Sequence, residues 1–255
     1  MRQNRHRPRP QDASPAREEG GVLLYGLHAV SAALANPARR LRRLLVTRGA
    51  EQELAERFSP PWRITPELVE RNRLDAMLPP DAIHQGAALM VEPLASPNME
   101  RLLEGTSGPV LVLDQVTDPR NVGAILRSAA AFGAAALVLQ ERHAPAETGA
   151  LARAASGALE VVPILREVNL SRALEQLKKA GLWVVGLEAA GPVTLAQSGL
   201  TGRRVALVLG AEGEGLRRLT RETCDELVRL PIQASMESLN VSAAAAVALY
   251  ELARE

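Results

Sequence analysis

Apolar and polar positions follow two different rhythms along this chain, and the change falls near residue 109. Beyond it, the apolar runs VLVLD, AALVLQ, EVVPIL, LWVVGLE, VALVLG and ELVRLP are separated mostly by helix-like stretches. Strands that lack in/out alternation and are followed by crossovers indicate a parallel sheet covered on both faces. The pattern therefore predicts an α/β domain with a parallel sheet over residues 109–255.

Before this region the apolar runs are shorter, and helix-like and strand-like stretches alternate. The helix-like stretches LHAVSAALAN and PELVERNRLDAML alternate with the strand-like runs RLLVT and GAALMVE, which predicts a small α/β domain over residues 21–94. The Pro- and Gly-containing residues 95–108 predict a linker. Residues 1–20 are rich in Arg, Pro and Gln and almost free of apolar side chains, which predicts a disordered basic tail.

Composition places the chain among globular proteins without a global charge bias. Its hydrophobic content is 47% and its net charge is +1, so any surface for nucleic acid must be local. One such cluster of arginines stands in ARRLRRLLV, and it is either a solvated charge run or a set of phosphate contacts. Its members are Arg39, Arg40, Arg42 and Arg43.

The cysteine content and the lengths of the apolar runs indicate the cellular compartment of the protein. Cys224 is the single cysteine and has no Cys or His neighbour at metal-ligand spacing, which indicates a structural thiol in a reducing compartment and no metal site. The apolar runs are shorter than the roughly 18 residues that span a bilayer, and the N-terminus lacks a signal-peptide core. We therefore expect a cytoplasmic protein without a membrane segment.

Ligands of parallel sheets bind beyond the carboxyl ends of the strands, so candidate chemistry lies in the loops after Leu113, Gly210 and Leu230. The first loop leads into DPRNVGAILRSAAAFGA, in which Asp118-Pro119 predicts a capped helix start and Gly133 its end.

Two polar residues of this helix are ambiguous from spacing alone. Asn121 is either a partner of the cap or a ligand contact. Arg127 lies away from the apolar stripe, so it is either a solvated charge or a cation offered to an anion in the crevice.

The second loop, GAEGEG, has the glycines of a phosphate cradle but no lysine. Its carboxylates, Glu212 and Glu214, would repel a ligand with several phosphates, so a neutral or cationic adenosine compound fits better. The alternative is a tight turn whose glutamates cap a helix beginning at Leu216.

The third loop, in LPIQASMESLNVSAAAA, precedes an alanine-rich C-terminal helix. Ser238 or Asn240 is suited to cap that helix. The small side chains along it allow close approach, either within the core or to a second subunit.

Taken together, the three loops match in order and spacing the motifs of the TrmH/SpoU branch of the SPOUT methyltransferases, which the chain resembles from Tyr25 to its C-terminus. The segments YGLHAVSAAL and IHQGAAL are similar to the RNA-recognition domain of members that methylate the 2′-oxygen of a guanosine in 23S ribosomal RNA. The resemblance implies a catalytic domain with a deep C-terminal trefoil knot, a homodimer, ribosomal RNA as partner and S-adenosylmethionine as cofactor.

The same resemblance implies roles for individual residues. The implied catalytic set is Asn121, Arg127, Glu212, Ser238 and Asn240. The implied cofactor-binding positions are Gly210, Leu230, Ile232, Ser238 and Leu239. The expected RNA contacts are Arg39, Arg40, Arg42, Arg43, His84 and Arg120, with a buried structural role as the alternative for His84.

Other functions remain open from the sequence. One is the same chemistry on transfer RNA, and another is a catalytically silent RNA-binding assembly factor that has kept the fold. A nicotinamide-dependent enzyme is excluded, because the first strand of the large domain is followed by DQVTDPRN in place of G-x-G-x-x-G.

Overall fold

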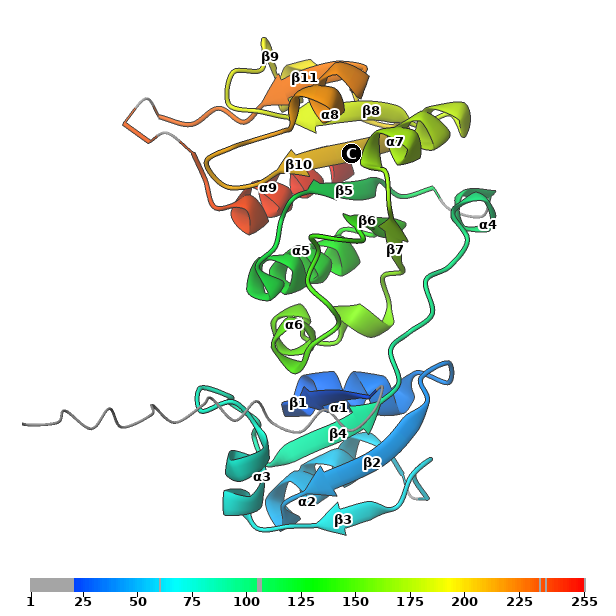
Figure 1. The fold of residues 1–255 in the computed structure, drawn as a ribbon, viewed down its shortest axis with the longest axis vertical. Coiled ribbons are helices and arrows are strands. Elements are labelled where there is room, and N and C mark those ends of the chain that lie inside the picture. Colours follow the sequence, from blue (N-terminus) through cyan, green and yellow to red (C-terminus); the bar gives the residue numbers. More distant parts are fainter. Residues whose placement is uncertain (1–20, 60, 105–106, 234, 237, 255) are drawn as a thin grey trace, which may run out of the picture.

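Two stacked α/β domains make up the described part of the chain (Figure 1). The computed structural model describes residues 21–59, 61–104, 107–233, 235–236 and 238–254. The basic tail predicted over residues 1–20 lies outside the described residues. The N-terminal domain faces helix α6 of the larger domain, and an extended segment that carries α4 joins the two.

The N-terminal domain contains a four-stranded sheet in the order β1-β4-β2-β3. Its strands are β1 (Val22–Tyr25), β2 (Leu41–Val46), β3 (Pro66–Leu68) and β4 (Ala87–Val91). Its helices are α1 (Leu27–Ala35), α2 (Arg48–Arg57) and α3 (Arg71–Met77).

One expectation for this domain is wrong. The stretch PELVERNRLDAML was predicted as one helix, but its first three residues form β3, paired in parallel with β2. Only Arg71–Met77 is helical. Pairing with the edge of the sheet overrides the local helical pattern at this place.

The larger domain contains a seven-stranded sheet whose pairings are all parallel, as the apolar runs predict. The strand order is β7-β6-β5-β10-β8-β11-β9, so β10 lies between β5 and β8. The strands are β5 (Val110–Asp114), β6 (Ala136–Gln140), β7 (Ile164–Glu167), β8 (Trp183–Leu187), β9 (Val193–Thr194), β10 (Val205–Gly210) and β11 (Glu226–Arg229). The helices are α4 (Met99–Glu104), α5 (Pro119–Ala131), α6 (Gly149–Ala155), α7 (Leu170–Lys179), α8 (Arg218–Thr223) and α9 (Val241–Ala253), with 3-10 turns η1 (Ala158–Glu160) and η2 (Leu195–Gln197).

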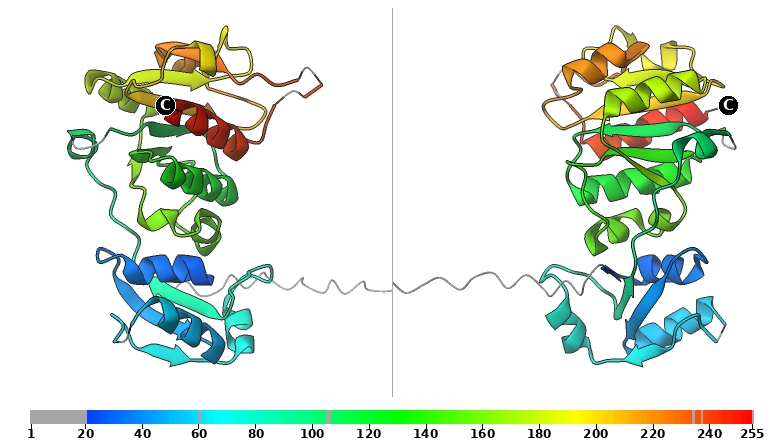
Figure 2. Two further views of the ribbon diagram at one scale, coloured as in Figure 1. Left: turned by 180° about the vertical axis from the view of Figure 1, so that it is seen from behind. Right: turned by 45° about the vertical axis from the view of Figure 1, so that its right-hand side comes forward.

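Helices cover both faces of this sheet, with α5 and α9 on one face and α7 and α8 on the other (Figure 2). Alternate strand residues enter two separate cores: Leu111 and Leu113 pack with α5 and α9, whereas Val110 and Val112 pack with α4 and α7. Met99 and Leu103 of α4 are buried in the second core, so the predicted linker 95–108 contains a helix packed on the larger domain.

The cap signals of the sequence are confirmed at α5. The side chain of Asp118 accepts a hydrogen bond from the Arg120 amide at 2.8 Å, Pro119 occupies the first turn, and Gly133 follows the helix with a φ of 68°. Burial raises the pKa of Cys224 to about 12, which supports a structural thiol. No helix in the described ranges is long and apolar enough to cross a membrane.

A buried arginine joins the two domains. Arg39 of the N-terminal domain is 0% exposed and donates to Glu147 at 2.5 Å and to Glu160 at 2.6 Å, both in the larger domain. It also donates to the backbone oxygen of Glu92 at 2.9 Å. Burial lowers the pKa of Arg39, but the hydrogen bonds and charges of the two glutamates outweigh it and raise the pKa. The expectation that Arg39 contacts RNA is therefore wrong, because its guanidinium is enclosed.

We predict that Arg39→Ala lowers the free energy of unfolding by about 3–5 kcal/mol, because it leaves two carboxylates without their cation in a buried place. Urea unfolding followed by circular dichroism measures this change. The matched control is Arg40→Ala, whose side chain is 80% exposed and 3.5 Å from Glu92, and a change within about 0.5 kcal/mol is expected there. Equal losses in the two variants would contradict the interpretation.

Candidate active site

Three loops that are distant in the sequence meet at the carboxyl edge of the large sheet. Glu212 follows β10, Asn121 lies in the first turns of α5, and Asn240 precedes α9. The Glu212 Oε1 atom accepts hydrogen bonds from Asn121 Nδ2 at 3.1 Å, Asn240 Nδ2 at 2.6 Å and the Val241 amide at 3.2 Å. We call Asn121, Glu212 and Asn240 the Glu212 cluster.

Asn240 serves the cluster and the start of α9 together. Its Oδ1 accepts from the Ser242 amide at 2.9 Å and the Ser242 hydroxyl at 2.6 Å, which confirms the predicted cap of the last helix. Its Nδ2 also donates to Asn121 Oδ1 at 3.1 Å. The amide is therefore oriented, with its oxygen toward the helix and its nitrogen toward the carboxylate.

The glycines of GAEGEG fold the loop back on its own strand. A Cβ on Gly210 would lie 2.2 Å from the carbonyl carbon of Gly215, and Gly213 and Gly215 have φ values of 81° and 68°. The alternative that the glutamates cap the following helix is wrong, because α8 begins at Arg218 without a side-chain cap. The Glu212 carboxylate accepts from the start of α9 instead.

The other implied catalytic residues lie apart from the Glu212 cluster. Arg127 is exposed on α5 and makes no hydrogen bond or ion pair with the described residues, so its guanidinium is available to an anion. Ser238 is also exposed and makes no hydrogen bond with that part of the chain. Only the family pattern therefore assigns these two residues to the site, because neither side chain hydrogen-bonds the Glu212 cluster.

The implied cofactor positions lie at the end of β10, directly after β11 and just before α9. Leu230 packs against the core, while Ile232 and Leu239 are 36% and 38% exposed. Met236, which the sequence reasoning missed, adds a further exposed apolar side chain. Ile232, Met236 and Leu239 thus place three exposed apolar side chains in the segment between β11 and α9, and the signal that could have found Met236 is its position between the other two.

The expected RNA contacts divide into two groups. His84 is 1% exposed, and its ring is held by Asp75 at 2.9 Å and the Gly86 amide at 3.0 Å, so the expected RNA contact is wrong and the structural alternative holds. The remaining residues keep exposed surface but are engaged with carboxylates. Arg40 and Arg42 pair with Glu92, Arg43 pairs with Glu67, and Arg120 pairs with Asp81 across the two domains.

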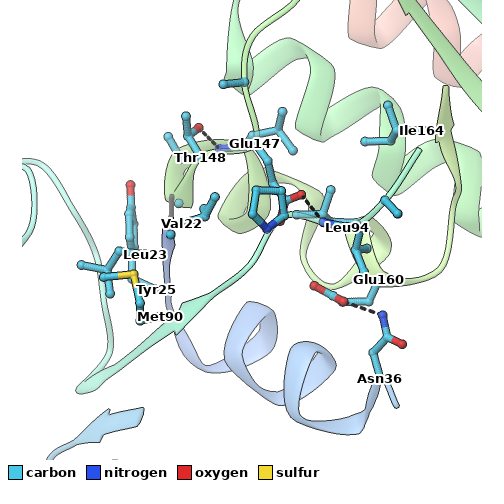
Figure 3. A pocket seen from close by; sticks show the side chains of 18 of the residues that line it. Val22, Leu23, Tyr25, Asn36, Met90, Leu94, Glu147, Thr148, Glu160 and Ile164 are labelled. Atoms are coloured by element: carbon cyan, nitrogen blue, oxygen red, sulfur yellow. Dashed lines mark hydrogen bonds between the residues drawn. The ribbon is translucent and has the colours of Figure 1, made fainter. Parts of the chain in front are cut away.

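A cavity of about 1330 Å³ between the two domains lies away from this site. Side chains of both domains line it, including Tyr25, Glu147 and Ile164 (Figure 3), and none of the Glu212 cluster does. We therefore assign the chemistry to the sheet edge, where polar groups converge. Among the described residues no group of three or more His, Cys, Asp or Glu could hold a metal ion.

Comparisons with known proteins identify the family of the chain. The family model "SpoU rRNA Methylase family" matches residues 108–250, and "RNA 2'-O ribose methyltransferase substrate binding" matches residues 23–97. The chain therefore belongs to the SpoU rRNA methylase family.

Relatives cover nearly the same length. The chain is 42% identical to 23S rRNA (guanosine-2'-O-)-methyltransferase RlmB of Pasteurella multocida, over 91% of this chain and 97% of the relative. It is 38% identical to RlmB of Escherichia coli K12, over 91% and 98%. The solved structure of the SpoU methyltransferase AviRb from Streptomyces viridochromogenes with the cofactor AdoMet aligns with a TM-score of 0.76 at 25% identity, over 92% of this chain and 89% of that one.

Substitution of Asn240 separates its two roles. Asn240→Ser keeps a capping oxygen, whereas Asn240→Ala removes it and is expected to lower the free energy of unfolding by about 1 kcal/mol more. Both variants lose the donor to Glu212 and are expected to lose methyl transfer to the same extent. Thermal unfolding and a single-turnover assay measure the two effects, and full activity in Asn240→Ser would contradict a role for the amide in the site.

Proposed function

We propose that this chain transfers the methyl group of S-adenosylmethionine to the 2′-oxygen of a guanosine ribose in 23S ribosomal RNA. The observation that carries the proposal is the Glu212 cluster, in which the carboxylate of one loop of the family pattern hydrogen-bonds residues of the other two. The relatives align with this chain along the N-terminal domain as well, and their names support 23S ribosomal RNA as the substrate.

The residues present fit this cofactor. S-adenosylmethionine, when bound, supplies an electrophilic methyl group on a cationic sulfonium and carries no phosphate. The carboxylate-bearing loop after β10 lacks the lysine of a phosphate site, and the exposed Ile232, Met236 and Leu239 offer apolar contact. The backbone near Gly210, Leu230 and Leu239, with Ile232 and Ser238, would hold the cofactor.

The residues of the chain then orient the ribose 2′-hydroxyl, which is the nucleophile, and accept a hydrogen bond from it. The hydrogen bonds from the described residues to Glu212 all reach Oε1, which leaves Oε2 to accept from substrate. A guanidinium is a poor proton acceptor, so we assign Arg127 to stabilising the developing 2′-oxyanion or the adjacent phosphate and not to acting as a base. Ser238 would complete the orientation of substrate and cofactor.

This role of Arg127 predicts that Arg127→Ala lowers kcat by about 10²–10³-fold. Arg127→Lys keeps the charge but loses the planar fork, so we expect an intermediate loss. Single-turnover methyl transfer across pH measures both. Near-full turnover in Arg127→Lys, or a wild-type rate that rises with a guanidine-like pKa, would contradict the assignment.

The test of the whole function is transfer of labelled methyl from S-adenosylmethionine to unmodified 23S ribosomal RNA and, in parallel, to bulk transfer RNA, followed by nucleoside analysis. We expect label in 2′-O-methylguanosine from the ribosomal RNA alone. Label in transfer RNA would overturn the substrate and keep the chemistry. Absence of label and of cofactor binding would instead favour a silent RNA-binding factor.

The N-terminal domain, residues 21–94, is proposed to bind the RNA, and residues 109–255 to carry catalysis, with 95–108 between them. Arg40, Arg42 and Arg43 retain exposed surface at the start of β2 in the N-terminal domain, and Arg120 lies next to Asn121 in the sequence. Phosphates would compete with the carboxylates that now pair with these arginines, so RNA affinity should fall steeply with salt.

A homodimer is proposed through helix α9. Val247 and Tyr250 are exposed on it, and the Tyr250 ring meets Phe132, which caps the end of α5, edge-on at 6.1 Å between ring centres. These side chains form an apolar surface where the two helices lie side by side. We predict a dimer at micromolar concentration by sedimentation velocity, and a monomer for Val247→Glu. The control Val168→Glu changes another exposed valine and should stay dimeric, whereas a monomeric wild type would contradict the proposal.

We also propose that the C-terminal segment forms the trefoil knot of the SPOUT fold. After β11, on the β8 side of β10, the chain returns past the loop of Glu212 to place α9 beside α5. A knot requires in addition that this segment passes through a loop of the chain, and we propose that it does. Pulling the chain from its two ends should then stop short of the full unfolded length, and full extension would contradict the knot.

A further inference from the structure

Asp114 is a buried carboxylate that the mechanism above does not use. It is the last residue of β5, whose other residues are all apolar, and it is 0% exposed. Its Oδ1 accepts from Arg217 Nε at 2.6 Å and its Oδ2 accepts from the Arg217 amide at 3.0 Å. Both oxygens are thus satisfied by one residue, which lies at the end of the loop that carries Glu212.

The Asp114–Arg217 pair lies beside the loop that carries Glu212. Asp114 is aligned with Gly210 in the pairing of β5 with β10, so it stands beside the residue where that loop begins. On the other side of β10, Glu188 follows β8 and pairs with Arg221 of α8. The segment that leaves the loop is therefore held from the strands on both sides of β10.

We infer that Asp114 is a positioning residue, which fixes the Arg217 end of loop 211–217 and thereby places Glu212 against Asn121 and Asn240. The inference rests on the proposed function. The loop contains Gly213 and Gly215, whose backbone freedom is costly to restrict, and the close approach of Gly215 to Gly210 persists only while the exit of the loop stays fixed.

The fold alone does not explain a charge at this place. A buried ion pair gives little net stability relative to well-packed apolar residues, because both ions lose hydration. A leucine or valine would continue the apolar run of β5. A carboxylate that binds both a side chain and a backbone amide instead fixes the loop in one geometry. Catalysis requires such a fixed geometry, whereas the stability of the fold does not.

The test compares Asp114→Asn with a matched control, Asp225→Asn, in the full chain. Asp225 also binds a backbone amide, that of Val184 at 2.9 Å, and a cation, Lys178 at 2.9 Å, but it does not hold the Glu212 loop. We expect Asp114→Asn to lower kcat on the order of 10²-fold with the KM for RNA little changed, and Asp225→Asn to change neither by more than about twofold.

Two further readouts separate positioning from general destabilisation. In the Glu212→Gln background, Asp114→Asn should add little further loss, since it acts through Glu212. Amide hydrogen exchange should rise in residues 211–217 and at Val241, a readout independent of activity that stands even if the proposed reaction fails. Equal kcat losses in the two aspartate variants, multiplying losses with Glu212→Gln, or unchanged exchange would overturn the inference. If Asp114→Asn does not fold, Arg217→Gln, whose parent side chain is 39% exposed, carries the same expectations.

Discussion

A single oxygen atom, Glu212 Oε1, holds three segments together at the carboxyl edge of the large sheet. It accepts from two side-chain amides and one backbone amide, and those donors come from the loops after β5 and β11. Without this acceptor the donors would hydrogen-bond to water, and no shared hydrogen-bond partner would hold the three loops together. The cluster therefore converts three separate turns into one site, and every role proposed for Asn121 or Asn240 depends on it.

The strand order makes this convergence possible. Because β10 lies between β5 and β8, the loop of Glu212 leaves the sheet beside the loop that leads to α5, and the chain after β11 returns to the same edge. The glycines permit the sharp reversal, and the buried Arg39 sets the N-terminal domain against the larger one. The domain proposed to bind RNA is thus held against the domain proposed to carry catalysis.

Much of this arrangement could be predicted from the sequence, because it depends on local signals. The apolar runs predict the main strands, and cap residues such as Asp118 and Asn240 mark helix starts. Two of the failures share a physical cause, which is pairing between residues that are far apart in the sequence. Arg39 looks like a surface cation until Glu147 and Glu160, 108 and 121 residues away, enclose it, and β3 exists only because β2 offers it an edge.

The central claim, that the Glu212 cluster acts as one unit, is tested most directly by a double-mutant cycle on Asn121→Ala and Asn240→Ala in single-turnover methyl transfer to 23S ribosomal RNA. If one network positions the substrate, either substitution disrupts it, and the double variant should be no more than a few fold slower than the worse single variant. Losses that multiply across the two sites would show that the residues act independently, and would contradict the account.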